Sequence, residues 1–151
     1  MTNNHVTRSQ LVELLNELNG ILMVNSIGEL MGYLQEQDIS PPRFMALQII
    51  ELHPGITITT LAHQLKLTLG SASQLIDRLE NDGLVIRQEV PNDRRVRRIF
   101  LREKGQNILN AVHTMTSVKL DLQLSTIPNE HIDTLYTAIT NVLPYLNKDV
   151  K

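Results

Sequence analysis

The chain has 151 residues, 42% of them hydrophobic, and a formal net charge of −2 at pH 7, so it can bury the core of one domain with helical extensions. It contains no cysteine, which excludes disulfides, thiolate metal sites and cysteine nucleophiles. No segment approaches the ~20 consecutive apolar residues of a membrane span and the start lacks a signal-peptide pattern, so we expect a cytoplasmic protein with no membrane partner.

One long amphipathic helix is predicted first, because apolar residues recur at three- and four-residue steps from Gln10 to Gln35. Gly20, Gly28 and Gly32 lie inside this pattern, and each costs about 0.5–1 kcal/mol in a helix interior. Two explanations stay open. Either another backbone packs closely against these glycines, which we favour, or the helix bends or ends near Ile27.

Three shorter helices follow, each with a recognisable start. Ser40-Pro41-Pro42 is an N-cap with proline in the first turn, and the helix that it opens stops at Pro54-Gly55. Thr57 can cap a third helix and Thr68 a fourth, which ends at Gly83. Two short helices joined by so tight a turn predict a helix-turn-helix, in which the second helix is free to enter a DNA groove.

A β-hairpin with a basic tip is predicted next. Leu84–Val90 and Ile99–Leu101 are rich in β-branched or large apolar residues, and Pro91–Asp93 between them has turn chemistry. Seven basic residues stand against three acidic ones between Arg87 and Lys104. Such an excess steers an anionic partner if folding gathers it on one surface.

Two more helices are expected after the hairpin, from about Glu103 to Leu120 and from Pro128 to Leu146, with Pro144 able to bend the second. The predicted fold class is therefore mostly α with a small β-hairpin wing. A winged helix-turn-helix at residues 40–102 is flanked by helices at 1–39 and 103–151. Their apolar stripes need a partner.

Three segments carry a resemblance to a known family: Leu61-Ala62, the run Ser71–Arg87 with its Asp-Arg-Leu-Glu and Gly-Leu-Val elements, and Pro91–Arg95. They resemble the MarR family of winged helix-turn-helix transcriptional regulators, and the helix order is similar over nearly the whole chain. The resemblance implies a homodimer in which residues 1–39 and 103–151 form the dimerisation region. Two copies of the DNA-binding domain, residues 40–102, would then reach successive major grooves of a pseudo-palindromic duplex.

The fourth helix offers polar groups on the side opposite its apolar stripe. Gln74 can pair bidentately with adenine, hydroxyl groups can bond bases or phosphates, and a glycine lets the backbone approach closely. The DNA-binding residues predicted from this helix are Thr68, Gly70, Ser71, Ser73, Gln74 and Arg78.

The resemblance places Arg94 and Arg95 at the tip of the wing, which in such proteins reaches into the minor groove. Asp93 is expected to stabilise the wing through an ion pair, because a carboxylate would repel phosphate. Arg97 and Arg98 alternate across the strand, and we favour Arg97 as the one that points at the duplex.

Other chemistry finds little support in the sequence. The five histidines lack metal-ligand spacing, and no nucleophile elbow, phosphate-cradling loop or carboxylate pair occurs, so we expect no enzyme, no metal and no cofactor. Relatives in the family commonly bind a small amphipathic or aromatic effector in a crevice beside the winged unit. A methionine on an apolar stripe more often packs in a core. The side chains that could line the crevice are Met23, Phe44, Met45, His53 and Met115.

Our interpretation is a dimeric regulator of transcription that binds double-stranded DNA; we expect a repressor that a small effector can release, although the sequence also allows an activator. The alternative that stays open is a winged-helix module that binds protein and has no affinity for DNA, because one fold serves several functions.

Overall fold

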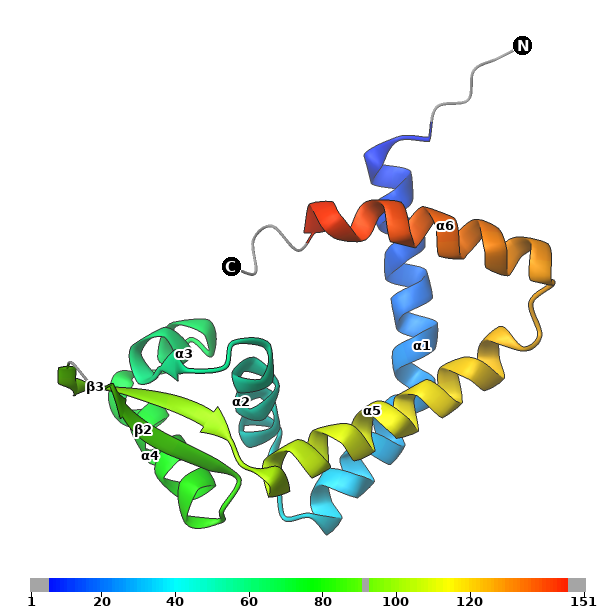
Figure 1. The fold of residues 1–151 in the computed structure, drawn as a ribbon. Helices are drawn as coiled ribbons and strands as arrows, with labels where there is room; N and C mark the ends of the chain where they lie inside the picture. The colour runs from blue at the N-terminus through cyan, green and yellow to red at the C-terminus, as the bar shows by residue number, and fades with distance from the viewer. Residues whose placement is uncertain (1–5, 91–92, 147–151) are drawn as a thin grey trace. The chain divides into compact units, whose positions relative to one another are not determined.

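A computed structural model describes residues 6–90 and 93–146, and within these ranges it holds six helices and three strands (Figure 1). For Asn25, Val90 and residues 93–96 the description covers the backbone alone. The chain divides into two compact units, one reaching Met115 and the other starting at Thr116. The predicted fold class, mostly helical with a small antiparallel sheet, is confirmed.

The first helix, α1, runs unbroken from Arg8 to Glu36. Thr7 caps it in a capping box: the Gln10 backbone N–H donates to Thr7 Oγ1 at 3.3 Å, and the Thr7 N–H donates to Gln10 Oε1 at 2.9 Å. These bonds satisfy N–H groups that have no partner inside the helix. The helix therefore begins two residues before Gln10, where its apolar pattern placed the start, because the Thr7 cap sets the boundary.

The glycines of α1 do not have the role that we favoured. The helix does not end near Ile27, and a Cβ atom added at Gly20, Gly28 or Gly32 would meet no described atom of the chain within 4 Å. The expected close packing of another backbone is therefore wrong within this chain.

The second helix, α2, spans Pro41–Leu52, as its proline signal predicted. Ser40 stands at the cap position, but its side chain makes no cap hydrogen bond within the described part of the chain. After the helix the backbone turns at Gly55, which has a φ of +81°, a conformation that favours glycine.

Helices α3 (Ile58–Gln64) and α4 (Leu69–Asn81) form the predicted helix-turn-helix. Thr57 and Thr68 cap them as expected, each accepting a hydrogen bond from a backbone N–H three residues later, at 3.2 and 3.1 Å. Gly83, with a φ of +73°, follows the end of α4. Local capping signals therefore fix where α4 begins and ends.

The sheet has three antiparallel strands in the order β1-β3-β2: β1 at Ile56–Thr57, β2 at Val85–Val90 and β3 at Asp93–Leu101. The apolar run Ile99–Leu101, which marked the second hairpin strand in the sequence, covers only the end of β3. β1 was not predicted as a strand. It pairs with the C-terminal half of β3, through Ile56 with Ile99.

The pairing of β2 with β3 is regular near the core and shifts near the tip. Glu89 pairs with Arg97, whereas Val90 pairs with Asp93, so the three residues 94–96 lie between consecutive partners on β3. Such a shift bends a strand locally. Pro91 and Asn92, the first two residues of the predicted turn, lie outside the described residues.

The core lies inside the winged unit, where α2, α3 and α4 pack with the strands. Leu47, Leu61, Ile76 and Val85, from four different elements, are each 0% exposed. The helix α5 (Glu103–Leu124) begins against this core. A Cβ at Gly105 would lie 2.3 Å from the Leu84 carbonyl oxygen, so glycine is required for this close approach.

The last helix, α6, spans Asn129–Leu146 with Pro144 inside it, and none of its described residues is buried. Along α1, too, large apolar side chains are exposed, for example Leu14 at 62% and Val24 at 75%. No helix in the described ranges combines the length and the apolar character needed to cross a membrane.

Candidate nucleic-acid interface

One side of α4 is built from small and polar residues that are open to solvent. Gly70, Ser71, Gln74 and Arg78 are exposed, and Ser73 is half-buried. The other side of the helix supplies core residues that are 0% exposed, Ala72, Ile76 and Leu79. Because the inward side is fixed by packing, the polar side has one defined orientation relative to the winged unit.

The start of α4 presents a pair of hydroxyl groups. The oxygens of Thr68 and Ser71 lie 2.9 Å apart, and Thr68 Oγ1 also accepts the Ser71 backbone N–H at 3.1 Å. Each hydroxyl has one hydrogen, and the pair uses one of the two. One O–H donor is therefore left for a ligand. The Thr68 oxygen is already used as the helix cap.

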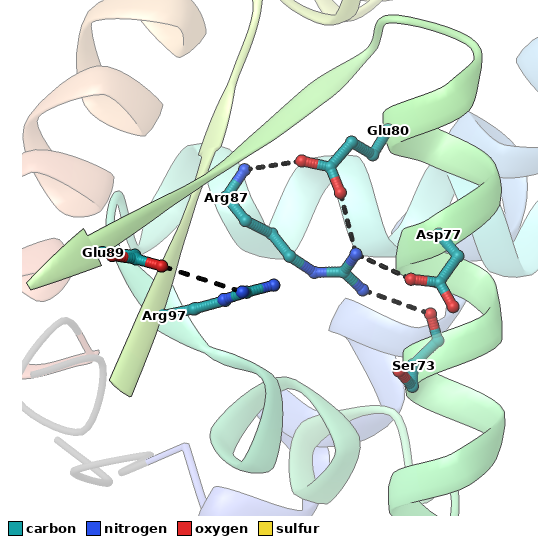
Figure 2. A network of polar contacts seen from close by, with 6 residues as sticks. All are labelled: Ser73, Asp77, Glu80, Arg87, Glu89 and Arg97. Carbon is teal, nitrogen blue, oxygen red and sulfur yellow. Dashed lines mark hydrogen bonds and ion pairs between the residues drawn. The ribbon is translucent and has the colours of Figure 1, made fainter. Parts of the chain in front are cut away.

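Arg87 of β2 connects the wing to α4, and Figure 2 shows its guanidinium group among acceptors of that helix. Nη1 lies 2.6 Å from Asp77 Oδ1 and 2.8 Å from Glu80 Oε2, and Nη2 donates to the Ser73 carbonyl at 3.4 Å. The Arg87 backbone N–H also donates to Glu80 Oε1 at 3.0 Å. We call these four residues the Arg87 clamp, since they hold the base of the wing against one side of α4.

Sequence reasoning counted Arg87 only as part of the basic excess, and so missed this role. A signal was available, because side chains alternate along a strand and Arg87 shares a side of β2 with Val85, which is 0% exposed. An arginine on the inward side of a strand needs buried or half-buried acceptors.

The next arginines are also partly engaged. Arg97 Nη2 lies 3.8 Å from Glu89 Oε1 on the neighbouring strand, and 62% of the Arg97 side chain is exposed (Figure 2). Arg98 Nη1 donates to the Gly55 carbonyl at 3.2 Å. Arg97 is thus freer to leave its partner, since an exposed pair of this kind contributes little.

A groove of about 420 Å³ lies between α4 and the sheet. Ser73 and Asp77 of α4 form one wall, Arg87 and Arg97 of the strands form the other, and the residues that begin α3 close its end. The groove contains both a carboxylate and guanidinium groups, so it is not a simple anion site.

The far end of α4 is held by cations from two other helices. Arg43 of α2 forms an ion pair with Asp82 and donates to the Asp38 carbonyl at 2.9 Å. Lys104 of α5 donates to the Asp82 carbonyl at 3.1 Å. A cation near the last carbonyls of a helix is favourable, and these contacts fix the C-terminal end of α4.

Arg78 differs from these arginines. It is exposed, and no carboxylate of the described residues lies within ion-pair distance of it. Of the predicted wing residues, Asp93, Arg94 and Arg95 belong to β3 by their backbone, but their side chains lie outside the described part of the structure. Their roles stay predictions.

The side chains predicted to line an effector crevice are found in different environments. Phe44 is 6% exposed and packs in the core, His53 and Met115 are half-buried, and Met23 and Met45 are each 52% exposed. Among the described residues no group of three or more histidine, aspartate or glutamate side chains could hold a metal ion.

Comparison with known proteins agrees with this architecture. The model of the MarR family matches residues 39–96. YsmB of Bacillus subtilis (strain 168), an uncharacterised HTH-type transcriptional regulator, is 37% identical over 81 residues, which cover 54% of this chain and 56% of that protein. The chain therefore spans little more than half the length of that relative.

Solved structures match over nearly all of the chain. A MarR family protein from Bacillus stearothermophilus is 27% identical, with a TM-score of 0.70 over 95% of this chain and 100% of that one. A variant of S. aureus MepR bound to an oligodeoxyribonucleotide shares the fold, with a TM-score of 0.58 at 21% identity over 94% and 99%. The MarR family model thus matches the winged unit, and the whole chain is similar in fold to MarR family structures.

Proposed function

We propose that the protein regulates transcription by binding double-stranded DNA at specific sequences, with α4 in the major groove and the β2–β3 wing at the adjacent minor groove. The observation that carries this proposal is the exposed polar side of α4, held in a fixed relation to the wing by the Arg87 clamp. A helix that is rigid at both ends suits a groove because little ordering is left to do on binding. The DNA-bound structure of MepR, a protein with the same fold, supports the proposal.

The cations that remain for phosphate are fewer than the sequence suggests. Arg87 is held by two carboxylates and Arg98 donates to a backbone carbonyl. We assign phosphate and minor-groove contacts to Arg78, Arg94 and Arg95, with Arg97 as a weaker candidate. Three cations per protomer would give a dimer about six phosphate contacts, and hence a loss of about a thousandfold in affinity between 50 and 200 mM salt.

We propose further that two copies act together on a pseudo-palindromic site. Exposed apolar side chains on α1 and α6 support this, because patches of that kind are unusual on a monomer. On α6 they include Leu135, Ile139, Val142 and Leu146. A twofold dimer would present two α4 helices, and its symmetry would appear in the DNA site.

Repression and release by a small amphipathic or aromatic effector complete the proposal. An effector can release DNA only if it binds the DNA-incompetent arrangement of the two winged units more tightly. Met23, Phe44, Met45, His53 and Met115 remain the residues proposed to line its site.

The test begins with selection of bound duplexes from a random pool, followed by fluorescence anisotropy on the selected site. Replacing Arg94 and Arg95 by alanine is expected to lower affinity for all duplexes together, whereas Gln74→Ala is expected to change the preference among sequences. Arg8→Ala is the matched control, because it removes a cation from the start of α1.

Retained affinity in both wing and helix variants would contradict the proposal, as would a salt dependence no steeper than that of a single ion pair. Failure of the unaltered protein to bind any duplex would favour the protein-interaction module instead.

A further inference from the structure

The recognition helix begins with an exposed leucine. Leu69 directly follows the cap residue Thr68, and 54% of its surface is exposed. It lies outside the cluster of buried and partly buried apolar side chains that forms the core of the described chain. Leu69 is therefore a large apolar group on a surface whose other members are small or polar, and folding does not require it.

The position of Leu69 on the helix is set by helical geometry. Residues four apart lie one above the other, so Leu69 shares a row with Ser73, and Gly70 shares the next row with Gln74. A Cβ at Gly70 would meet no described atom within 4 Å. The methyl groups of Leu69 therefore lie next to the row that contains Gln74, because the first member of that row, Gly70, has no side chain.

An apolar side chain in this place has one suitable partner in duplex DNA. Base pairs present hydrogen-bonding groups in the major groove together with a single apolar group, the C5-methyl of thymine. We propose that Leu69 determines specificity by packing against a thymine methyl in each half-site. This inference rests on the proposed DNA binding by α4, and it predicts A·T pairs beneath the first turn of that helix.

The experiment compares thymine with uracil, which lacks only the methyl group. In the duplex selected by the unaltered protein, each thymine is replaced in turn by uracil, symmetrically in both half-sites, and affinity is measured by fluorescence anisotropy. We expect one position at which the change weakens binding by about fourfold per half-site, the factor that corresponds to burial of one methyl group. Leu69→Ala is expected to bind both forms equally at that position.

Leu52→Ala is the matched control, because Leu52 is 66% exposed on α2, away from the polar side of α4. It should keep the full thymine preference. Thermal unfolding should be nearly unchanged in both variants, since each removes an exposed side chain from a helix.

The possible results separate the two proposals. If the unaltered protein binds its duplex but uracil is tolerated everywhere, or if Leu69→Ala keeps the same preference at every thymine, the role of Leu69 is disproved and DNA binding stands. If the unaltered protein binds no duplex, the proposed function fails and this inference fails with it.

Discussion

The winged unit and the terminal helices contain similar apolar patterns but place them differently. In the winged unit, Leu47 and Ile76 are 0% exposed, whereas Leu14 on α1 and Ile139 on α6 are 62% and 48% exposed. Helical spacing predicts which side of a helix is apolar, and it does so in both regions. It does not predict whether the same chain covers that side. The winged unit buries its own apolar groups, whereas α6 and most of α1 leave theirs exposed, with Leu34 near the end of α1 as a buried exception.

The largest expected effect comes from truncating one leucine in each region. Leu47→Ala leaves a cavity in a packed core and should lower the free energy of unfolding by about 2–5 kcal/mol. Leu14→Ala removes a side chain that is already exposed and should change it by less than about 0.5 kcal/mol in dilute protein. Urea unfolding followed by circular dichroism measures both. Equal losses would mean that Leu14 belongs to a packed core.

A charge placed on α6 tests whether a second copy covers that helix. Ile139→Glu would bury a carboxylate in the interface and should raise the dimer dissociation constant by about a hundredfold or more. Thr137→Glu adds the same charge on the opposite side of the same helix and should leave it nearly unchanged. Sedimentation velocity over a range of concentrations reads both variants. If the two variants sediment alike, the stripe containing Ile139 is not the interface.

The Arg87 clamp provides a comparison within the wing. Arg87→Met leaves Asp77 and Glu80 without their cation and should cost about 1–3 kcal/mol, towards the lower end because Asp77 is half exposed. Arg97→Met removes a long, exposed ion pair and should cost less than about 0.5 kcal/mol. Thermal and urea unfolding measure the difference. If the two changes lower stability equally, the Arg87 clamp does not stabilise the winged unit.

Sequence reasoning was most reliable where the signals are local. The caps Thr57 and Thr68 and the glycine after α4 lie within a few residues of the boundaries that they set, and these boundaries are confirmed. Side-chain chemistry at one end of a helix needs no knowledge of distant residues. The polar side of α4 was derived from the same kind of local pattern, and its exposure agrees with that derivation.

The features that could not be predicted from the sequence depend on residues far apart in the chain. β1 has two residues and exists only because Ile56 pairs with Ile99. The predicted apolar run began only at Ile99 because charged residues weaken a strand signal, yet β3 begins at Asp93 and its Arg97 and Arg98 pair with β2. The ion pair of Arg43 with Asp82 joins residues 39 positions apart. Contacts of this kind depend on the folded arrangement and leave little trace in a local pattern.

The smallest expected effect compares two threonine caps of the same chemistry. Thr68→Ala removes the bond from the Ser71 N–H at the start of α4, inside the packed winged unit, and should lower the free energy of global unfolding by about 1 kcal/mol. Thr7→Ala removes a similar bond from α1, where residues 6–21 are all exposed, so we expect local fraying and a global change below about 0.3 kcal/mol. Amide hydrogen exchange should show faster exchange in the first turn of α1 for Thr7→Ala, with the core amides unchanged. If Thr7→Ala lowers the free energy of global unfolding as much as Thr68→Ala does, the start of α1 unfolds together with the winged unit. The two regions would then differ in the exposure of their side chains but not in their stability.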